Sequence, residues 1–158
     1  MFFWVMTQKN TAPHFIEKIQ KMLMKRVLFL CTGNSCRSQM AEALVNHDLG
    51  QSWTAFSAGA RPAGFVHPLA LQVLSEIGIE HHGRSKSVDE WRGQEFDLVI
   101  TVCNDAAEEC PLWLGQGRRV HIGFPDPALA TGTPEEIRAV FRQVRDDIRT
   151  RVVEFLGN

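Results

Sequence analysis

Residues 27–50 read VLFLCTGNSCRSQMAEALVNHDLG, and this stretch decides the fold. The apolar run VLFL at 27–30 is typical of a short buried strand. SQMAEALVNHDLG at 38–50 has the apolar period of a helix that stops at Gly50. A loop therefore lies between the carboxyl end of a strand and the start of a helix, which is the unit from which parallel sheets are built.

The rest of the chain continues this alternation of strands and helices. Thr133 and Glu136 form a capping box with Pro134 at the first helical position, which marks the start of the last helix. We therefore expect an α/β fold of three layers, in which helices flank a central four-stranded parallel sheet. The further strands are predicted at 54–59, 97–103 and 118–124, and the further helices at 67–78 and 133–156.

Length, composition and charge predict one soluble domain. The chain has 158 residues, 44% of them hydrophobic, against roughly 100 to 200 residues for a typical domain. Lys and Arg number 17 and Asp and Glu 18, so the charge argues against a nucleic-acid binder. No apolar run reaches the roughly 18 residues of a membrane span, and MFFWVM at 1–6 lacks the basic flank of a secretory signal. We expect a cytoplasmic monomer that binds neither nucleic acid nor membrane.

The N-terminal residues differ from the rest. Apolar residues in FIEKIQKML (15–23) recur at helical spacing, which indicates a short amphipathic helix. The sequence from Met24 onward is a natural start for the first strand. We expect 1–24 to be a loosely attached extension, helical or poorly ordered, of a domain at 25–158.

The loop CTGNSCRS at 31–38 has the composition of an oxyanion site. Arg37 supplies a guanidinium that can clamp two oxygens. Cys31, at the mouth of this positive field, is the candidate nucleophile, and Ser38 is placed to hydrogen-bond its thiolate and to cap the following helix. We expect Cys36 to be an inert, buried thiol. The residues whose backbone N–H groups would cradle a tetrahedral oxyanion are Thr32, Gly33, Asn34, Ser35, Cys36 and Arg37.

These motifs resemble a known superfamily. The Cys-x5-Arg-Ser pattern of 31–38 resembles the loop of the low-molecular-weight protein tyrosine phosphatases. CTGNSCRSQMAE (31–42) looks more like the loop of the thioredoxin-coupled arsenate reductases that share their fold. The resemblance runs from about residue 25 to 155 and includes SAG at 57–59 and GFPDPA at 123–128. It implies a low-molecular-weight phosphatase-like fold and an oxyanion substrate such as arsenate or phosphate.

The resemblance also implies a general acid and a thiol relay. Asp126, before Pro127, stands at the position of the acid, which suits a reaction whose departing oxygen leaves more easily as water. In the implied mechanism Cys31 attacks arsenic, Cys103 then attacks Cys31 with release of arsenite, and Cys110 attacks Cys103. Thioredoxin, or glutaredoxin with a low-molecular-weight thiol, would reduce the final disulfide.

The relay places a condition on the segment that carries its last two cysteines. If residues 103–110 form a helix, their ends stand about 10.5 Å apart, beyond the roughly 4.4–6.8 Å between Cα atoms of a disulfide. The segment would then unwind on oxidation. Its polar sequence CNDAAEEC has no large apolar anchor that would oppose this change.

Some of the resembling reductases hold a potassium ion behind the loop with an Asn, a Glu, a Ser and an Asp. Asn34, Glu42 and Ser57 match three of these, whereas the Asp position falls near Ser87, with Lys86 beside it. We expect the Lys86 ammonium to take the place of the cation between Glu42 and Asn34, so that no metal is required. The absence of any Cys-x2-Cys pair argues against zinc.

Two alternatives stay open. A small phosphatase that acts on phosphotyrosine or arginine phosphate would use Cys31, Arg37 and Asp126 and leave Cys103 and Cys110 as bystanders. The sequence has no tyrosine, although such phosphatases usually carry aromatic residues around the pocket. A non-catalytic sensor would be oxidised at the same thiols without any dependence on an oxyanion.

Overall fold

The computed structural model describes residues 12–104 and 110–158, with a four-stranded sheet at the centre. The strands are β1 (Lys25–Cys31), β2 (Trp53–Gly59), β3 (Leu98–Thr101) and β4 (Arg118–His121). They lie in the order β2-β1-β3-β4, and each neighbouring pair is parallel. This topology confirms the expected α/β fold.

Two strands end earlier than predicted. Their predicted ends were Cys103 and Phe124, whereas the ladder stops at Thr101 and His121. The chain bends at Cys103, and beyond the ladder single hydrogen bonds continue, such as the one from Phe124 N–H to the Val102 carbonyl (3.2 Å). The bend leaves Cys103 at the carboxyl edge of the sheet.

The strand β1 is buried on both sides, because the sheet has a layer on each face. Val27 and Phe29 pack into the cluster on one face, and Leu28 and Leu30 into the cluster on the other, with no exposed surface on any of the four side chains. Alternate residues of a strand point to opposite faces, so a strand that is covered on both sides reads as an unbroken apolar run. This is the physical reason for the VLFL stretch.

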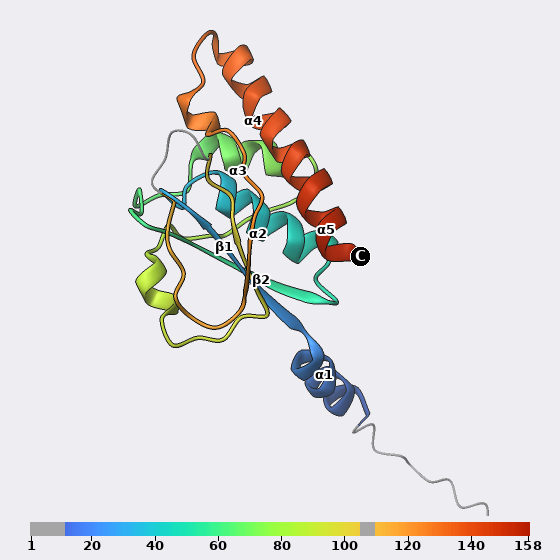
Figure 1. Ribbon diagram of the computed structural model, residues 1–158. Coiled ribbons are helices and arrows are strands. Elements are labelled where there is room, and N and C mark those ends of the chain that lie inside the picture. The colour runs from blue at the N-terminus through green and yellow to red at the C-terminus, as the bar shows by residue number, and fades with distance from the viewer. Residues whose placement is uncertain (1–11, 105–109) are drawn as a thin grey trace, which may run out of the picture.

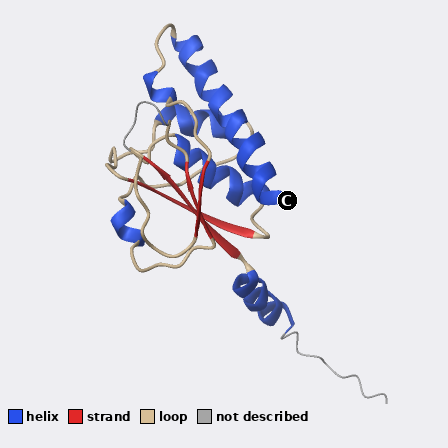
Figure 2. Ribbon diagram, in the orientation of Figure 1, coloured by secondary structure: helices blue, strands red, loops and turns tan. Residues whose placement is uncertain are grey.

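The two outer layers differ in thickness. The helices α2 (Arg37–Asp48), α3 (Pro68–Ser75) and α4 (Pro134–Ile148) pack on one another, and Figures 1 and 2 show them together on one side of the strands. On the other face the short 3-10 turn Val88–Trp91 and neighbouring loops cover the sheet. Their aromatic rings pack edge to face, with centroids 5.9 Å apart for Trp91 and Phe96 and 5.6 Å apart for Phe96 and Trp113.

The last helix begins where the sequence predicts. Thr133 Oγ1 accepts a hydrogen bond from Glu136 N–H (3.2 Å), which confirms Thr133 as the N-cap, and the Glu136 carboxylate contacts the Thr133 hydroxyl (3.2 Å). The helix does not run regularly to its end, because a π-helical turn at Arg149–Val153 separates α4 from α5 (Glu154–Gly157). The buried residues of its apolar face in α4 include Phe141, Val144 and Ile148.

The helix α1 (Ala12–Leu23) projects from the domain ahead of β1 (Figure 1). It contains the amphipathic segment at 15–23, and its apolar side chains are exposed, with 67% of Phe15 and 77% of Met22 accessible to solvent. The remainder of the expected extension, residues 1–11, lies outside the described residues. Among the helices of the described part of the chain, none combines the length and the apolar character needed to cross a lipid bilayer.

Candidate active site

The loop between β1 and α2 turns its carbonyl oxygens away from the helix start. Most of these oxygens accept hydrogen bonds from backbone N–H groups of the segment 60–67, which lies on the outer side of the loop. In a trans peptide the N–H points opposite to the carbonyl of the same peptide group, so bonded outer carbonyls turn the following N–H groups inward. The loop thus presents N–H groups at the N-terminus of α2, a position that suits an oxyanion. The bonds run from Ala60, Arg61, Ala63 and His67 N–H to the carbonyls of Cys31, Thr32, Gly33 and Ser35, at 3.2, 2.9, 2.8 and 3.1 Å.

Gly59, at the end of β2, allows the second strand to approach this loop. A Cβ atom at this position would lie 2.6 Å from the Thr32 carbonyl oxygen and 2.9 Å from Asn34 N. Both neighbours are backbone atoms that cannot move aside without breaking the loop. The sequence contains this glycine in SAG, but the reason for it is visible only in the structure.

The candidate nucleophile Cys31 is almost fully buried and held by two hydrogen bonds. Its Sγ lies 2.8 Å from Ser38 Oγ and accepts from Asn34 N–H at 3.2 Å. Ser38 Oγ also accepts from Asn34 Nδ2 (2.8 Å), which leaves the hydroxyl proton free to be donated to the sulfur. Donors in these positions can stabilise a negative charge that forms on the sulfur.

The expectation that Ser38 caps the helix is wrong. The helix α2 starts one residue earlier, at Arg37, and its N-cap is Cys36, whose side chain makes no capping bond. The Ser38 hydroxyl is occupied by Cys31 and Asn34, so it cannot serve the backbone. Burial, reinforced by the negative charges of Asp126 and Cys31, raises the pKa of the Cys36 thiol to about 12, as befits an inert thiol.

Arg37 and Asp126 meet above the loop. The Arg37 side chain is 3% exposed and donates from NH1 to the Phe124 carbonyl (3.1 Å). Its NH2 lies 3.7 Å from Asp126 Oδ2, while Asp126 Oδ1 accepts from Ala128 N–H (3.0 Å) at the start of the 3-10 turn Pro127–Leu129. The carboxyl group is partly open to solvent, and the arginine fixes it beside the oxyanion site.

The other two cysteines lie beyond the end of β3. Cys103 is fully buried, with Sγ 3.8 Å from the Leu30 carbonyl, whereas Cys110 is exposed. Burial, and then the neighbouring Cys110 thiol, raise the pKa of Cys103. Neither Cys103 nor Cys110 has helical backbone, and most of the segment between them, residues 105–109, lies outside the described residues.

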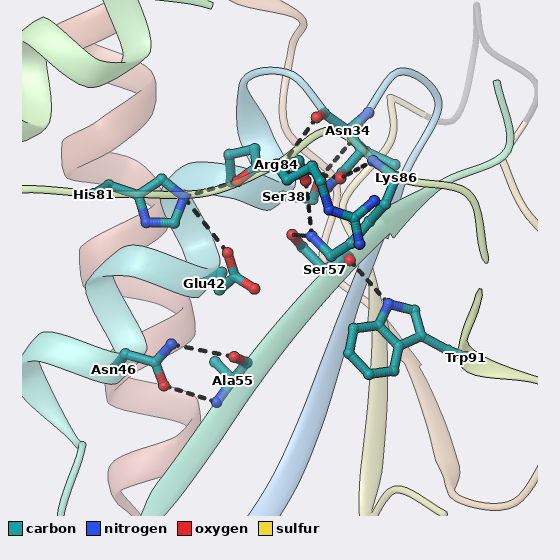
Figure 3. A network of polar contacts seen from close by, with 12 residues as sticks. Asn34, Ser38, Glu42, Asn46, Ala55, Ser57, His81, Arg84, Lys86 and Trp91 are labelled. Atoms are coloured by element: carbon teal, nitrogen blue, oxygen red, sulfur yellow. Dashed lines mark hydrogen bonds and ion pairs between the residues drawn. The ribbon is translucent and has the colours of Figure 1, made fainter. Parts of the chain in front are cut away.

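A polar network supports the loop from behind, as Figure 3 shows. The Lys86 ammonium donates to the Arg84 carbonyl (2.9 Å) and to Ser57 Oγ (3.3 Å), and the Lys86 backbone N–H donates to Asn34 Oδ1 (3.0 Å). The ammonium was expected between Glu42 and Asn34. In the structure the Lys86 backbone N–H, rather than the ammonium, contacts Asn34, and the ammonium donates to Ser57 and Arg84.

Glu42 faces the same network. Burial raises the pKa of its carboxyl to about 7, although the Lys86 charge and hydrogen bonds from Ser57 act in the opposite direction. Burial also lowers the pKa of Lys86. Two residues that the sequence did not single out, Gln39 and His81, complete the network through a hydrogen bond of 2.7 Å between their side chains.

Comparison with known proteins yields consistent relatives. Residues 26–158 match the family described as low molecular weight phosphotyrosine protein phosphatase. An arsenate reductase of Halalkalibacterium halodurans is 48% identical over 135 residues, which cover 85% of this chain and 96% of that protein. A solved structure of an arsenate reductase in the phosphate binding state has a TM-score of 0.70 and 31% identity, covering 85% of this chain and 98% of the other. A thioredoxin-dependent arsenate reductase from Corynebacterium glutamicum has a TM-score of 0.58 and 31% identity, covering 90% of this chain and 67% of the other.

Proposed function

This chain belongs to the low molecular weight phosphotyrosine protein phosphatase family, and from that premise we propose that it is an arsenate reductase that uses three of its cysteines. One observation carries the proposal beyond the family resemblance. A second thiol, Cys103, lies buried at the carboxyl edge of β3, next to the strand that ends in Cys31, and a third thiol, Cys110, interacts with Cys103 and is open to solvent. A hydrolase has no use for this series of thiols.

The first step joins sulfur to arsenic. Arsenate binds to the inward N–H groups of residues 32–37, and the Arg37 guanidinium balances its charge. The Cys31 thiolate attacks arsenic, and Asp126 gives a proton to the departing oxygen, which leaves as water. Ser38 and Asn34 hold the sulfur in place for the attack.

The second and third steps move the oxidising equivalents to the surface. Cys103 loses its proton and attacks Cys31 Sγ, the electron pair of the sulfur–arsenic bond passes to arsenic, and arsenite leaves as a Cys31–Cys103 disulfide forms. The Cys110 thiolate then attacks Cys103 Sγ and frees Cys31. Two electrons have reached arsenic, and the oxidised pair is Cys103–Cys110.

The physiological reductant in this proposal is thioredoxin, with glutaredoxin and a low-molecular-weight thiol as the other source of electrons. The Corynebacterium glutamicum neighbour is described as thioredoxin-dependent, which supports thioredoxin. All four cysteines are free thiols, as the resting state of this relay requires, and a reducing cytoplasm is where such thiols persist. The proposed enzyme acts there as a monomer.

The test is arsenate-dependent NADPH consumption with thioredoxin and thioredoxin reductase. We expect steady turnover for the wild-type protein and none for Cys110→Ser. Without reductant, the variant should still release about one arsenite per protein, because Cys31 and Cys103 suffice for one turnover. Hydrolysis of an aryl phosphate by the same preparation controls for an intact loop. Sustained turnover of Cys110→Ser would overturn the relay.

Slow phosphate ester hydrolysis is a second candidate activity. The loop, Arg37 and Asp126 are complete without the other two cysteines, and positioning plus electrostatic stabilisation suffices for phosphoryl transfer. Brisk hydrolysis of an aryl phosphate, with no arsenate turnover by either thioredoxin or glutaredoxin, would make this the main function.

A further inference from the structure

Asn34 adopts a backbone conformation that its neighbours must enforce. Its φ of 48° lies in the left-handed region, and it is the only non-glycine residue with positive φ in the described part of the chain. Asparagine enters this region more readily than most side chains, but the conformation is still less favourable than the right-handed one and needs support from neighbours. The conformation aims the Asn34 N–H at Cys31 Sγ (3.2 Å) and Asn34 Nδ2 at Ser38 Oγ (2.8 Å). The geometry of the nucleophile therefore depends on whatever holds Asn34.

Gln39 holds Asn34 from the buried side of α2. Its Nε2 donates to the Asn34 carbonyl (3.2 Å), to Asn34 Oδ1 (3.0 Å) and to the Arg84 carbonyl (3.0 Å), and the side chain has no exposed surface. Because all three partners are oxygen acceptors, the end of the Gln39 amide that faces them must be its nitrogen. Gln39 Oε1 must therefore point the other way.

His81 meets that oxygen. Its Nε2 lies 2.7 Å from Gln39 Oε1, and an amide oxygen only accepts, so His81 Nε2 carries the proton and donates. The same nitrogen lies 3.4 Å from Glu42 Oε2 (Figure 3). Burial, and then the positive charges of Lys86 and His82, lower the pKa of His81, so the neutral ring with a proton on Nε2 is favoured at neutral pH.

We propose that Gln39 and His81 are positioning residues for the chemistry of Cys31: His81 orients the Gln39 amide, and Gln39 keeps Asn34 aimed at the thiolate. Neither side chain touches the reacting atoms in this account. The proposal rests on the proposed function for its physiological substrate. The positioning itself concerns the nucleophile and applies to any oxyanion that the loop accepts.

The test compares variants of Gln39 and His81 with a control variant of another amide on α2, the helix that carries Gln39. Gln39→Ala removes the holding amide, His81→Leu removes its donor, and His81→Gln restores an N–H donor at similar reach. The control is Asn46→Ala. Asn46 is also an amide on α2, but its bonds go to the Ala55 backbone of β2, at 2.8 and 3.1 Å, away from the loop.

The first measurement is the pH dependence of Cys31 alkylation by iodoacetamide, resolved by mass spectrometry of the modified site. For Gln39→Ala and His81→Leu we expect the midpoint to rise by about one pH unit, equivalent to about tenfold less thiolate at lower pH. His81→Gln should return the midpoint close to that of the wild type. Asn46→Ala should lower the melting temperature without moving the midpoint.

The second measurement is kinetic, with both arsenate and an aryl phosphate as substrate. Gln39→Ala and His81→Leu should lower kcat about tenfold and change KM by less than about threefold, because the inward N–H groups and Arg37 still bind the oxyanion. Equal effects on both substrates are expected. If arsenate is not turned over at all, the aryl phosphate still tests the positioning, so failure of the proposed function is recognised separately.

Three outcomes would overturn the inference. They are an unchanged midpoint and kcat in His81→Leu, a midpoint in His81→Gln that stays with His81→Leu, and an Asn46→Ala midpoint that moves as far as the others. Should Gln39→Ala fail to fold, the two His81 variants still decide the question.

Discussion

The thiol in the loop and the thiols beyond β3 are held in opposite ways. Cys31 Sγ contacts Ser38 Oγ and Asn34 N–H, and backbone N–H groups of the segment 60–67 hydrogen-bond to the carbonyls of the loop around it. Cys103 Sγ lies 3.8 Å from the Leu30 carbonyl and interacts with the Cys110 thiol, which is exposed to solvent. Binding and attack need groups that are organised before the substrate arrives. A relay needs a thiol that reaches from a buried partner to an external reductant. In the proposed mechanism these two demands fall on neighbouring strand ends, one at the end of β1 and one beyond β3.

The largest effect should come from Cys31→Ser, because Cys31 is the proposed nucleophile at the loop and also the first thiol of the proposed relay. The loop would still bind an oxyanion, but no sulfur would attack it. Arsenate reduction and aryl phosphate hydrolysis should both fall by about 10⁴-fold or more. Both rates are measured on one preparation, with phosphate binding by calorimetry as the check of a folded loop. Retention of either activity would show that Cys31 is not the nucleophile.

Asp126→Asn should give the next largest effect, because Asp126 is the proposed general acid and lies beside the loop near Arg37. Loss of a general acid costs about 10²–10⁴-fold in rate. The loss should be greater for an alkyl phosphate than for a nitrophenyl phosphate, since a good leaving group needs less help from a proton. Steady-state hydrolysis of the two esters tests this, and an equal loss for both would contradict the acid role.

Glu42→Gln tests the electrostatics behind the loop. Burial raises the pKa of Glu42 from 4.5 to about 7, so the folded protein binds this proton more tightly than the unfolded chain. The resulting stability is fully present below pH 4.5 and is lost as the pH rises through about 7. The free energy of unfolding of the wild type should fall by up to about 3 kcal/mol relative to Glu42→Gln over this range. Urea unfolding at a series of pH values measures this difference. If the free energies of unfolding of the two proteins depend on pH in the same way, the raised pKa of Glu42 is refuted.

The smallest effect is expected for Cys110→Ser on stability. Because Cys110 is exposed, its replacement should change the free energy of unfolding by no more than about 0.5 kcal/mol. The same substitution is expected to abolish turnover, so function and stability separate at this residue. If urea unfolding showed that the free energy of unfolding falls by several kcal/mol, the region of Cys103 and Cys110 would be packed as firmly as the loop around Cys31.

The sequence predicts local features well. The alternation of apolar runs, the capping residues Thr133 and Glu136, and the glycine-containing loop after VLFL all act through near neighbours, and the strands, the main helices and the position of the loop follow from them. Its error at Ser38 arises because the hydroxyl, which could cap a helix, bonds to Cys31 and Asn34, and that contact depends on the folded shape of the loop.

Long-range contacts could not be predicted from such patterns. His81 and Gln39 stand 42 positions apart, and nothing in either local sequence indicates that they meet. The same holds for the closeness of Gly59 to the Thr32 carbonyl, which depends on the register of β1 and β2. These contacts arise only once the sheet has brought distant segments together.

The segment 60–67 supports the loop through its main chain and turns most of its side chains outward. Residues 61–65 are exposed, while backbone N–H groups of Arg61 and Ala63 hold the loop carbonyls. Support of this kind depends little on the side chains at exposed positions such as Arg61 and Ala63, whereas the φ of 88° at Gly64 favours glycine. Over evolutionary time the exposed side chains of this segment are therefore free to change, while the loop that its backbone supports keeps its shape.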